Sequence, residues 1–177
     1  MYEDSTKDLV SWMKVLFLTA LIVLAGRQFL IQPLSVHGES MMPTFENDDK
    51  VILNKISRIE NFDLIVFDAP DDHKLIKRVI GLPGDRLEMK ADRLYINGEL
   101  VEEPYLTHNR KVARQKGHSY LTEDFAEITV PAECYFVLGD NRLQSVDSRM
   151  FGFVPKEAVL GEVKFRFAPF EYLGAVE

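Results

Sequence analysis

The sequence contains a single cysteine, Cys134, in 177 residues, so no disulfide can form within the chain. Positive charge is also scarce: 21 lysines and arginines stand against 28 aspartates and glutamates, which gives a formal net charge of −7. An acidic chain without basic runs lacks the electrostatic pattern of a nucleic-acid-binding protein. We therefore expect no nucleic-acid partner, and we expect Cys134, in the apolar run ECYFVLG, to be a buried and inert thiol.

Sequence motifs for metals and phosphates are missing as well. The four histidines, His37, His73, His108 and His118, are scattered, and none belongs to an H-E-x-x-H motif. The segment GLPGD (81–85) has two glycines but lacks the Lys-Ser/Thr pair of a phosphate-binding loop, so it is interpreted as a tight turn. We expect neither a metal ion nor a cofactor.

Apolar residues are concentrated near the N-terminus. Residues 15–26 carry no charge, and a span over 11–30 is long enough to cross a bilayer if Lys14 and Arg27 extend their charges to the headgroups. Trp12 stands where an interfacial aromatic side chain belongs. A cleaved signal peptide and a buried soluble helix are the alternatives, although no A-x-A-like cleavage site follows the apolar run. We expect an uncleaved membrane anchor.

Charge divides the chain into two parts. Residues 1–35 sum to zero, so the whole net charge of −7 lies in residues 36–177. The second part is long enough to form one soluble core. We expect a short tail and an anchor helix over 1–35, followed by one globular domain. The mixed charges before the span do not fix its orientation by the positive-inside rule.

The globular part has the pattern of a β protein. Short segments rich in Ile, Val and Leu alternate with turn residues, and Asn97-Gly98 is the strongest hairpin signal in the chain. This pattern predicts a mostly β, antiparallel domain, with a polar, exposed, irregular loop over 103–124 and one helical turn within 155–163. The expected strands are 50–55, 63–68, 74–81, 86–90, 93–100, 127–131, 135–139 and 161–167.

Ser40, in the segment VHGESMMPTF (36–45), is a candidate nucleophile. It does not belong to a G-x-S-x-G elbow, because Met42 stands in the place of the second glycine. A serine needs a base to become nucleophilic. A histidine is one candidate base, either His37 or a more distant one, but no residue clearly supplies the acid that would orient it.

Lys77, in the predicted strand KLIKRVIG, is the other candidate base. In a strand it shares one face with Leu75 and Val79, both apolar. Burial on that face would lower the pKa of the lysine from about 10.4 toward roughly 8 and give a neutral amine that can accept a proton. An exposed strand lysine without a catalytic role is the alternative.

Three segments, GESMMPTF, KRVIGLPGD and GDNRLQSVDSRMFGFV, resemble the signature segments of bacterial type I signal peptidases, in the family's order and behind an N-terminal apolar segment. The resemblance covers roughly residues 10–170, and its compact spacing is similar to that of the shorter Gram-positive members. It implies a membrane-bound serine endopeptidase that removes N-terminal signal peptides from exported preproteins. The implied fold is an antiparallel β-sheet domain of the signal peptidase type with an N-terminal transmembrane helix.

The same resemblance implies the location and the partners. The protein would cross the bacterial cell membrane once, with a short cytoplasmic tail and with the catalytic domain, 36–177, on the extracytoplasmic side. Within that domain, residues 86–134 would include a variable hairpin and loop region. Its partners would be the signal peptides of exported preproteins and membrane lipid.

A role for each matching residue also follows from the resemblance. Ser40 is similar to the nucleophile and Lys77 to the general base of a Ser-Lys dyad that works through an acyl-enzyme. Ser145 resembles the serine that hydrogen-bonds and orients the lysine. The other supporting residues would form two ion pairs, Asp147 with Arg149 and Arg78 with Asp140.

Substrate preference would follow from small pockets. The family cleaves after small residues at −1 and −3, and Val36, Met41 and Ile76 flank the dyad in sequence and are expected to line those pockets. Core packing is their alternative role. Where some members carry a hydroxyl two residues before the nucleophile this chain has Gly38, so the oxyanion contacts would come from the Ser40 N–H with other backbone groups or a water. Phe151, a tryptophan in some members, is expected to affect packing only.

Two related classes are the alternatives. The self-cleaving SOS repressors also use a Ser-Lys pair on a β-rich domain, but they carry a DNA-binding helix-turn-helix that nothing in residues 1–35 resembles. An inactive pilus-assembly factor on the same scaffold would be expected to lack the nucleophile or the base. Because Ser40 and Lys77 are both present, an active peptidase is the favoured reading.

Overall fold

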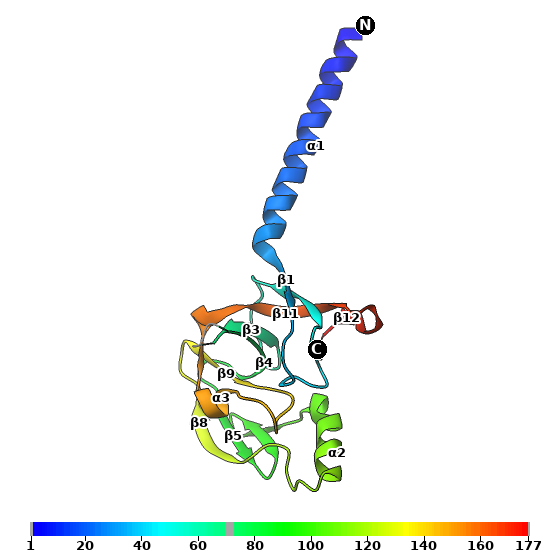
Figure 1. Ribbon diagram of the computed structural model, residues 1–177. Coiled ribbons are helices and arrows are strands. Elements are labelled where there is room, and N and C mark those ends of the chain that lie inside the picture. The colour runs from blue at the N-terminus through cyan, green and yellow to red at the C-terminus, as the bar shows by residue number, and fades with distance from the viewer. Residues whose placement is uncertain (1, 70–72, 177) are drawn as a thin grey trace.

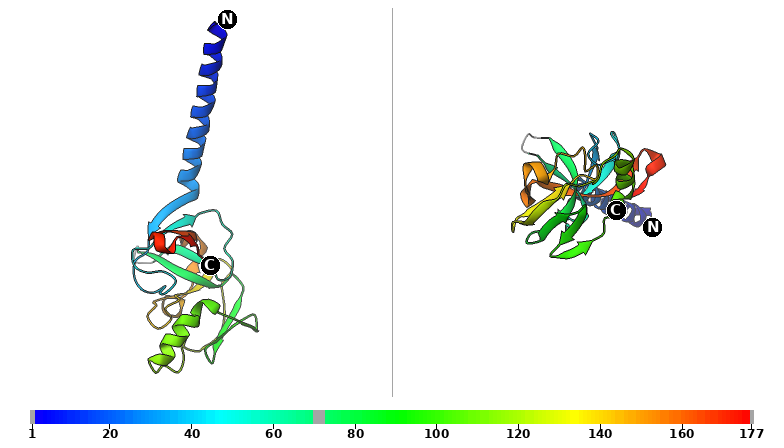
Figure 2. Two further views of the ribbon diagram at one scale, coloured as in Figure 1. Left: turned by 90° about the vertical axis from the view of Figure 1, so that its right-hand side faces the viewer. Right: turned by 90° about the horizontal axis from the view of Figure 1, so that it is seen from below.

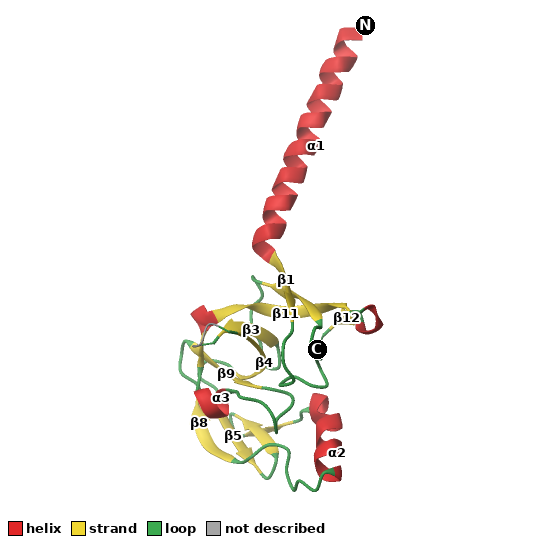
Figure 3. Cartoon of the chain, viewed as in Figure 1, coloured by secondary structure: helices red, strands yellow, loops and turns green. Residues whose placement is uncertain are grey.

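The computed structural model describes residues 2–69 and 73–176. One long helix, α1 (Tyr2–Leu30), projects from a body of strands, and the N-terminus lies at its far end (Figure 1, Figure 3). The strands form two sheets in which every pairing is antiparallel. The mostly β, antiparallel fold class predicted from the sequence is confirmed.

Helix α1 presents apolar side chains around its whole circumference. Val15, Leu16, Phe17 and Leu18 are consecutive and more than half exposed, and four residues cover a full helical turn. Within the described part of the chain, no helix reaches the length and apolarity required of a membrane span. The side chain of Arg27, expected at the headgroups, lies outside the described residues.

Strand β1 (Ile31–Ser35) follows α1 directly and pairs with β2 (Lys50–Asn54). Residues 31–35, which were expected to belong to the anchor segment, therefore lie in a sheet of the body. The strand was not predicted from the sequence because it contains Pro33, and proline lacks the N–H that an interior strand needs. It is tolerated here because β1 is the edge strand of its sheet.

The larger sheet has eight strands, in the order β1-β2-β11-β3-β4-β9-β10, with β12 beside β11. At its centre, β3 (Leu64–Asp68) pairs with β4 (Lys74–Gly81). All residues of β4 from Ile76 onward are buried, so both faces of this strand are covered. This burial places two adjacent basic residues, Lys77 and Arg78, in the interior. The remaining strands of this sheet are β9 (Cys134–Leu138), β10 (Val154–Pro155), β11 (Val159–Ala168) and β12 (Gly174–Ala175).

The smaller sheet has the order β7-β6-β5-β8 and lies at the end of the body away from α1 (Figure 2). The Asn97-Gly98 turn joins β6 to β7 as predicted, with φ angles of 55° and 85° that suit a type I′ turn. The strands are β5 (Arg86–Lys90), β6 (Arg93–Ile96), β7 (Glu99–Val101) and β8 (Phe125–Thr129).

The segment 103–124 is not an exposed irregular loop, and that expectation was wrong. It contains a short helix, η1 (Pro104–Leu106), followed by α2 (Thr107–Gln115). Three of its apolar residues form a buried cluster, which anchors the segment to the body. Sequence reasoning missed the helix because only one residue of α2 is buried, which is too few for a periodic apolar pattern. The cluster consists of Leu106, Ala113 and Leu121.

Three further short helices complete the chain. The helical turn expected within 155–163 is present as η2 (Lys156–Ala158), and the other two are α3 (Ser148–Phe151) and η3 (Phe170–Tyr172). Cys134 is half-buried, so the expectation of a fully buried thiol was wrong. The reason is its position at the first residue of β9, where it pairs with the two-residue edge strand β10.

Candidate active site

Ser40 lies in the turn that follows β1. Gly38 precedes it with a φ of 90°, a conformation that favours glycine, and its N–H donates to Oδ1 of Asn47. The N–H of Met42 donates to the carbonyl of Glu39, which closes the turn around Ser40. The serine is therefore presented on a hydrogen-bonded loop whose entry depends on glycine.

Lys77 reaches Ser40 from the central strand β4. Its Nζ donates a hydrogen bond of 2.5 Å to Oγ of Ser40. The lysine is only 1% exposed, because β4 is enclosed by its neighbours β3 and β9 and by the packing on both faces. The structure thus brings together the two residues that the sequence singled out as nucleophile and base.

Burial lowers the pKa of Lys77 from 10.5 to about 8, because the interior disfavours the ammonium form. The negative charges of Asp147 and Asp140 act in the opposite direction. Both carboxylates are already paired with arginines, so neither is committed to the lysine. Near neutral pH a useful fraction of Lys77 is therefore a neutral amine that can accept a proton.

Arg78, the next residue on β4, forms the expected ion pair with Asp140. Its Nε donates to Oδ1 at 3.0 Å and its Nη2 to Oδ2 at 2.8 Å, with the two side chains 1% and 0% exposed. The hydroxyl of Thr44 donates to the same carboxylate, and the ring of Tyr105 lies 4.0 Å from the guanidinium carbon. The pair fixes the loop that contains Asp140 against the central strand.

Asp147 and Arg149 form the second expected pair. Nε and Nη2 of Arg149 each donate to the carboxylate at 2.8 Å, and the N–H of Gly139 donates to it at 3.0 Å. Burial raises the pKa of Asp147, but these hydrogen bonds and the charge of Arg149 outweigh it and hold the pKa below its usual value. Asp147 is therefore an anion that ties the Gly139 backbone to α3.

Ser145 lies beside the dyad, but the hydrogen bond expected between it and Lys77 is not formed. Its buried Oγ has no partner of standard hydrogen-bond geometry among the described residues, although its proximity to Asp147 helps to lower that carboxyl's pKa. The lysine instead donates to Ser40. The structure places Ser145 near the dyad, as the sequence motif indicated, but without the expected hydrogen bond to Lys77.

Gly139 is the point at which these elements converge. A Cβ at this position would lie 2.2 Å from Oγ of Ser145 and 2.5 Å from the carbonyl oxygen of Ser40. Both distances are far below van der Waals contact, so only glycine lets the backbone approach so closely.

The three residues expected to line the substrate pockets lie together in one apolar cluster. Val36 is 3% exposed, Met41 1% and Ile76 7%, and all three pack in the same core. Their packing role is therefore evident, and only a small part of their surface is available to a ligand. Phe151, the departure expected to affect packing only, packs against Phe67 and Val79 in a separate core cluster.

The alternative base, His37, lies at the surface beside Asp48. Its side chain is 75% exposed and its Nδ1 lies 3.9 Å from a carboxylate oxygen of Asp48. Within residues 2–69 and 73–176, no cluster of three or more histidine, cysteine, aspartate or glutamate side chains could hold a metal ion.

Asn141 and Asn109 hold the nucleophile loop, and sequence reasoning assigned neither a role. The N–H of Asn141 donates to the carbonyl of Ser40 at 3.0 Å, and its side chain donates to the carbonyl of Glu39 at 3.0 Å. Asn109, on α2, donates to the carbonyls of Met42 at 2.9 Å and Asp140 at 2.7 Å. Asn141 belongs to the motif GDNRLQSVDSRMFGFV, so the sequence offered a reason to consider it. Asn109 lies in a polar stretch without a motif, so the sequence offered no such reason.

Arg142 is the centre of a second buried network that sequence reasoning missed. Its Nη2 donates to Oε1 of Glu103 at 2.5 Å, and both side chains are 0% exposed. Its Nε donates to the carbonyl of Gly139, and its Nη1 to the hydroxyl of Thr122. This network attaches the helical segment 103–124 to the loop behind the dyad.

Comparisons with known proteins agree with this geometry. The family model described as "Signal peptidase, peptidase S26" matches residues 9–168. The chain is 43% identical over 169 residues to signal peptidase I S of Bacillus subtilis (strain 168), covering 93% of this chain and 91% of that protein. It is 46% identical over 162 residues to signal peptidase I of Bacillus caldolyticus, covering 88% and 89%. It is 36% identical over 178 residues to signal peptidase IB of Staphylococcus aureus (strain Mu50 / ATCC 700699), covering 93% and 92%.

The fold is similar to a crystal structure of a signal peptidase I from Enterococcus faecalis V583. The TM-score is 0.56 at 42% sequence identity, and the match covers 60% of this chain and 97% of the other. These matches confirm the resemblance that three sequence segments carried, and they favour a signal peptidase over a self-cleaving repressor. The chain belongs to the signal peptidase family, peptidase S26.

Proposed function

We propose that this protein removes signal peptides from exported preproteins, with Ser40 as the nucleophile and Lys77 as the general base. The observation that carries the assignment is the 2.5 Å contact between Lys77 Nζ and Ser40 Oγ. The lysine is buried, and its pKa of about 8 supplies a neutral amine near physiological pH. A proton acceptor within hydrogen-bond distance of a serine hydroxyl is the arrangement that nucleophilic catalysis requires.

The reaction follows as acyl transfer in two halves. Lys77 takes the proton of the Ser40 hydroxyl while Oγ attacks the scissile carbonyl carbon, and the bound carbonyl oxygen becomes an oxyanion. The C–N bond then breaks, the lysine returns its proton to the leaving amine, and the signal peptide remains as an ester on Ser40. In the second half, Lys77 takes a proton from water, the hydroxide attacks the ester, and Ser40 recovers its proton.

The oxyanion is stabilised by backbone donors in this proposal. The N–H of Ser40 is the first candidate, since it belongs to the residue that attacks. A hydroxyl two residues earlier is ruled out by Gly38, whose φ of 90° would strain any other residue. The absence of that side chain is thus compatible with the turn geometry, which itself depends on glycine.

Substrate choice is assigned to the apolar wall beside the dyad. Val36, Met41 and Ile76 form the floor of shallow pockets for the side chains at −1 and −3. Their burial at 3%, 1% and 7% supports small pockets, because little apolar surface is left for a large side chain to cover. Ser145, with its buried hydroxyl beside the dyad, orients Lys77 once substrate occupies the site.

Helix α1 is assigned as an uncleaved, single-pass anchor in the cell membrane, with the body on the extracytoplasmic side. The exposed apolar side chains around α1 support this role, because water is a poor environment for them. Trp12, 69% exposed near one end of the expected span over 11–30, suits the membrane interface. A signal peptide is itself held in the bilayer, so a shared membrane raises its effective concentration at the site.

The test is cleavage of a preprotein by the full-length chain in detergent, with the masses of both fragments determined. Ser40→Ala and Lys77→Met are each expected to abolish cleavage while the circular dichroism spectrum is unchanged. Lys74→Met is the matched control, because Lys74 lies on the same strand and its side chain is 43% exposed in an ion pair with Asp68. Wild-type turnover in either dyad variant would contradict the assignment.

A further inference from the structure

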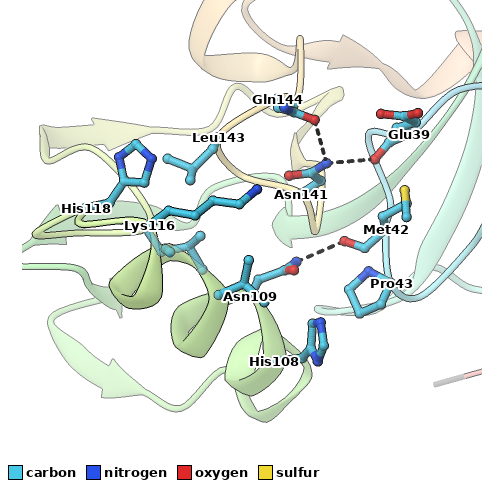
Figure 4. Close-up of a pocket in the computed structure, with 13 residues that line it drawn as sticks. Glu39, Met42, Pro43, His108, Asn109, Lys116, His118, Asn141, Leu143 and Gln144 are labelled. Carbon is cyan, nitrogen blue, oxygen red and sulfur yellow. Dashed lines mark hydrogen bonds between the residues drawn. The ribbon is translucent and has the colours of Figure 1, made fainter.

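A cavity of about 520 Å³ lies between α2 and the nucleophile loop (Figure 4). Its walls come from the residues on either side of Ser40, from the face of α2 that carries Asn109 together with residues that follow α2, and from the loop after Asp140. The neighbours of Ser40 that line it are Glu39 and Met42. The cavity therefore begins where the scissile bond must lie if Ser40 attacks it.

One wall of the cavity belongs to α2, which lies far from the anchor helix α1 (Figure 1). β1 leads from α1 toward Ser40, and α2 stands at the opposite end of the body (Figure 1). A signal peptide held by the membrane approaches from the α1 end. The part of the preprotein after the scissile bond must then leave toward α2, along this cavity.

The segment 107–118, which contributes α2 to this wall, is basic in a chain that is acidic as a whole, and Lys116 is the one lysine or arginine of this segment that lines the cavity. Residues 107–118 contain four lysines and arginines, two histidines and no carboxylate, against a net charge of −7 for the chain. Lys116 extends across the cavity toward Asn141 (Figure 4). Its ammonium has no hydrogen-bond or ion-pair partner within the described part of the chain. The one carboxylate in the lining, Glu39, lies next to Ser40.

We infer that this cavity binds the first residues of the mature protein, in extended form, and that Lys116 favours acidic side chains among them. The inference rests on the proposed function, because it takes the scissile bond to lie at Ser40. Glu39 disfavours an acid at the position next to the cut. The preference therefore applies to positions +2 to +5, which an extended chain carries away from Ser40 at about 3.3 Å per residue.

The experiment uses three preproteins that share one signal peptide and differ only at mature positions +2 to +5, which hold glutamates, glutamines or lysines. The full-length chain in detergent cleaves each, and kcat/KM is measured. The glutamate substrate is expected to exceed the lysine substrate by about three- to fivefold, the size of one solvent-accessible charge pair. Lys116→Gln is expected to remove this ratio, and high salt to reduce it.

Lys111→Gln is the matched control, since it removes the same charge from the same basic segment, 107–118, and Lys111 lines a different hollow from Lys116. It is expected to leave the ratio as in the wild type. Equal rates for all three substrates, or equal effects of the two variants, would overturn the inference and leave the proposed function intact. Failure to cleave any substrate at the signal-peptide junction would overturn both.

Discussion

Lys77 and Arg78 are adjacent on β4 and almost fully buried, yet only Arg78 is paired with a carboxylate. Arg78 makes two hydrogen bonds to Asp140, whereas the Nζ of Lys77 donates to the neutral hydroxyl of Ser40. Burial without a carboxylate partner favours the uncharged form of the lysine. The strand thus holds a permanent cation for structure beside an amine that is available for proton transfer.

The pH dependence of cleavage follows from the pKa of about 8 of Lys77. Below that value only the neutral fraction is active, so kcat/KM is expected to rise about tenfold per pH unit between pH 6 and 7 and to level off above about pH 8.5. Lys74→Met should give the same profile, because that lysine does not contact the dyad. A profile that is flat from pH 6 to 8 would contradict a neutral lysine base.

Replacing Lys77 is expected to stabilise the fold while abolishing activity. The folded pKa of about 8 lies below the ordinary 10.5, so the unfolded state binds more protons between these values and the free energy of unfolding rises with pH across this window. At pH 7 the buried ammonium opposes folding, so Lys77→Met should raise the free energy of unfolding by about 1–3 kcal/mol. Denaturation followed by circular dichroism at pH 7 and pH 10 measures the difference, which should shrink at pH 10. A less stable variant at pH 7 would show that the lysine stabilises the fold.

The buried pair of Arg78 and Asp140 should matter far more for stability than the exposed pair of Asp68 and Lys74 on β3 and β4. Asp140→Ala leaves the arginine buried without its partner and is expected to lower the free energy of unfolding by about 3–5 kcal/mol. Asp68→Ala breaks the pair with Lys74, whose side chains are 47% and 43% exposed, and should lower it by at most about 1 kcal/mol. Urea denaturation of both variants compares them directly, and similar losses would contradict the structural role of the buried pair.

Gly139 is expected to tolerate no side chain. Gly139→Ala would place a Cβ 2.2 Å from Ser145 Oγ and 2.5 Å from the Ser40 carbonyl, so the nucleophile loop must shift. A displacement of about 1 Å at the reacting groups lowers kcat by about 100-fold. Gly174→Ala is the control, because a Cβ there meets no atom within 4 Å. A wild-type kcat in Gly139→Ala would contradict the claim that close packing at Gly139 fixes the nucleophile loop.

Much of the fold could be predicted from the sequence because its local signals agree with one another. The run KLIKRVIG (74–81) corresponds to β4 residue for residue, and Asn97-Gly98 forms the predicted hairpin. Strand β1 was missed because it contains Pro33, and proline disfavours a strand except at the edge of a sheet. Helix α2 was missed because only one of its residues is buried, and the helix is stabilised by tertiary packing and not by an apolar period.

The candidate site also contains residues that could be predicted from the sequence and residues that could not. Ser40 and Lys77, the proposed nucleophile and base, could be singled out from motifs because the proposed chemistry demands those residue types. The residues that hold the loop behind them could not be identified in this way, since Asn109 and Glu103 come from a polar segment whose position is set by long-range contacts. The contact of Ser145 was also mispredicted, because a motif indicates which residues are neighbours but not the direction of each hydrogen bond.

The central claim is that burial lowers the pKa of Lys77 enough for a fraction of it to be an uncharged amine beside Ser40 at physiological pH. Its most direct test is an NMR titration of the full-length chain with isotope-labelled lysine side chains, in which the Lys77 signal is the one missing from Lys77→Met. The predicted result is a pKa near 8, well below the 10.5 of an ordinary lysine. A Lys77 signal that titrates near 10.5 would contradict the claim.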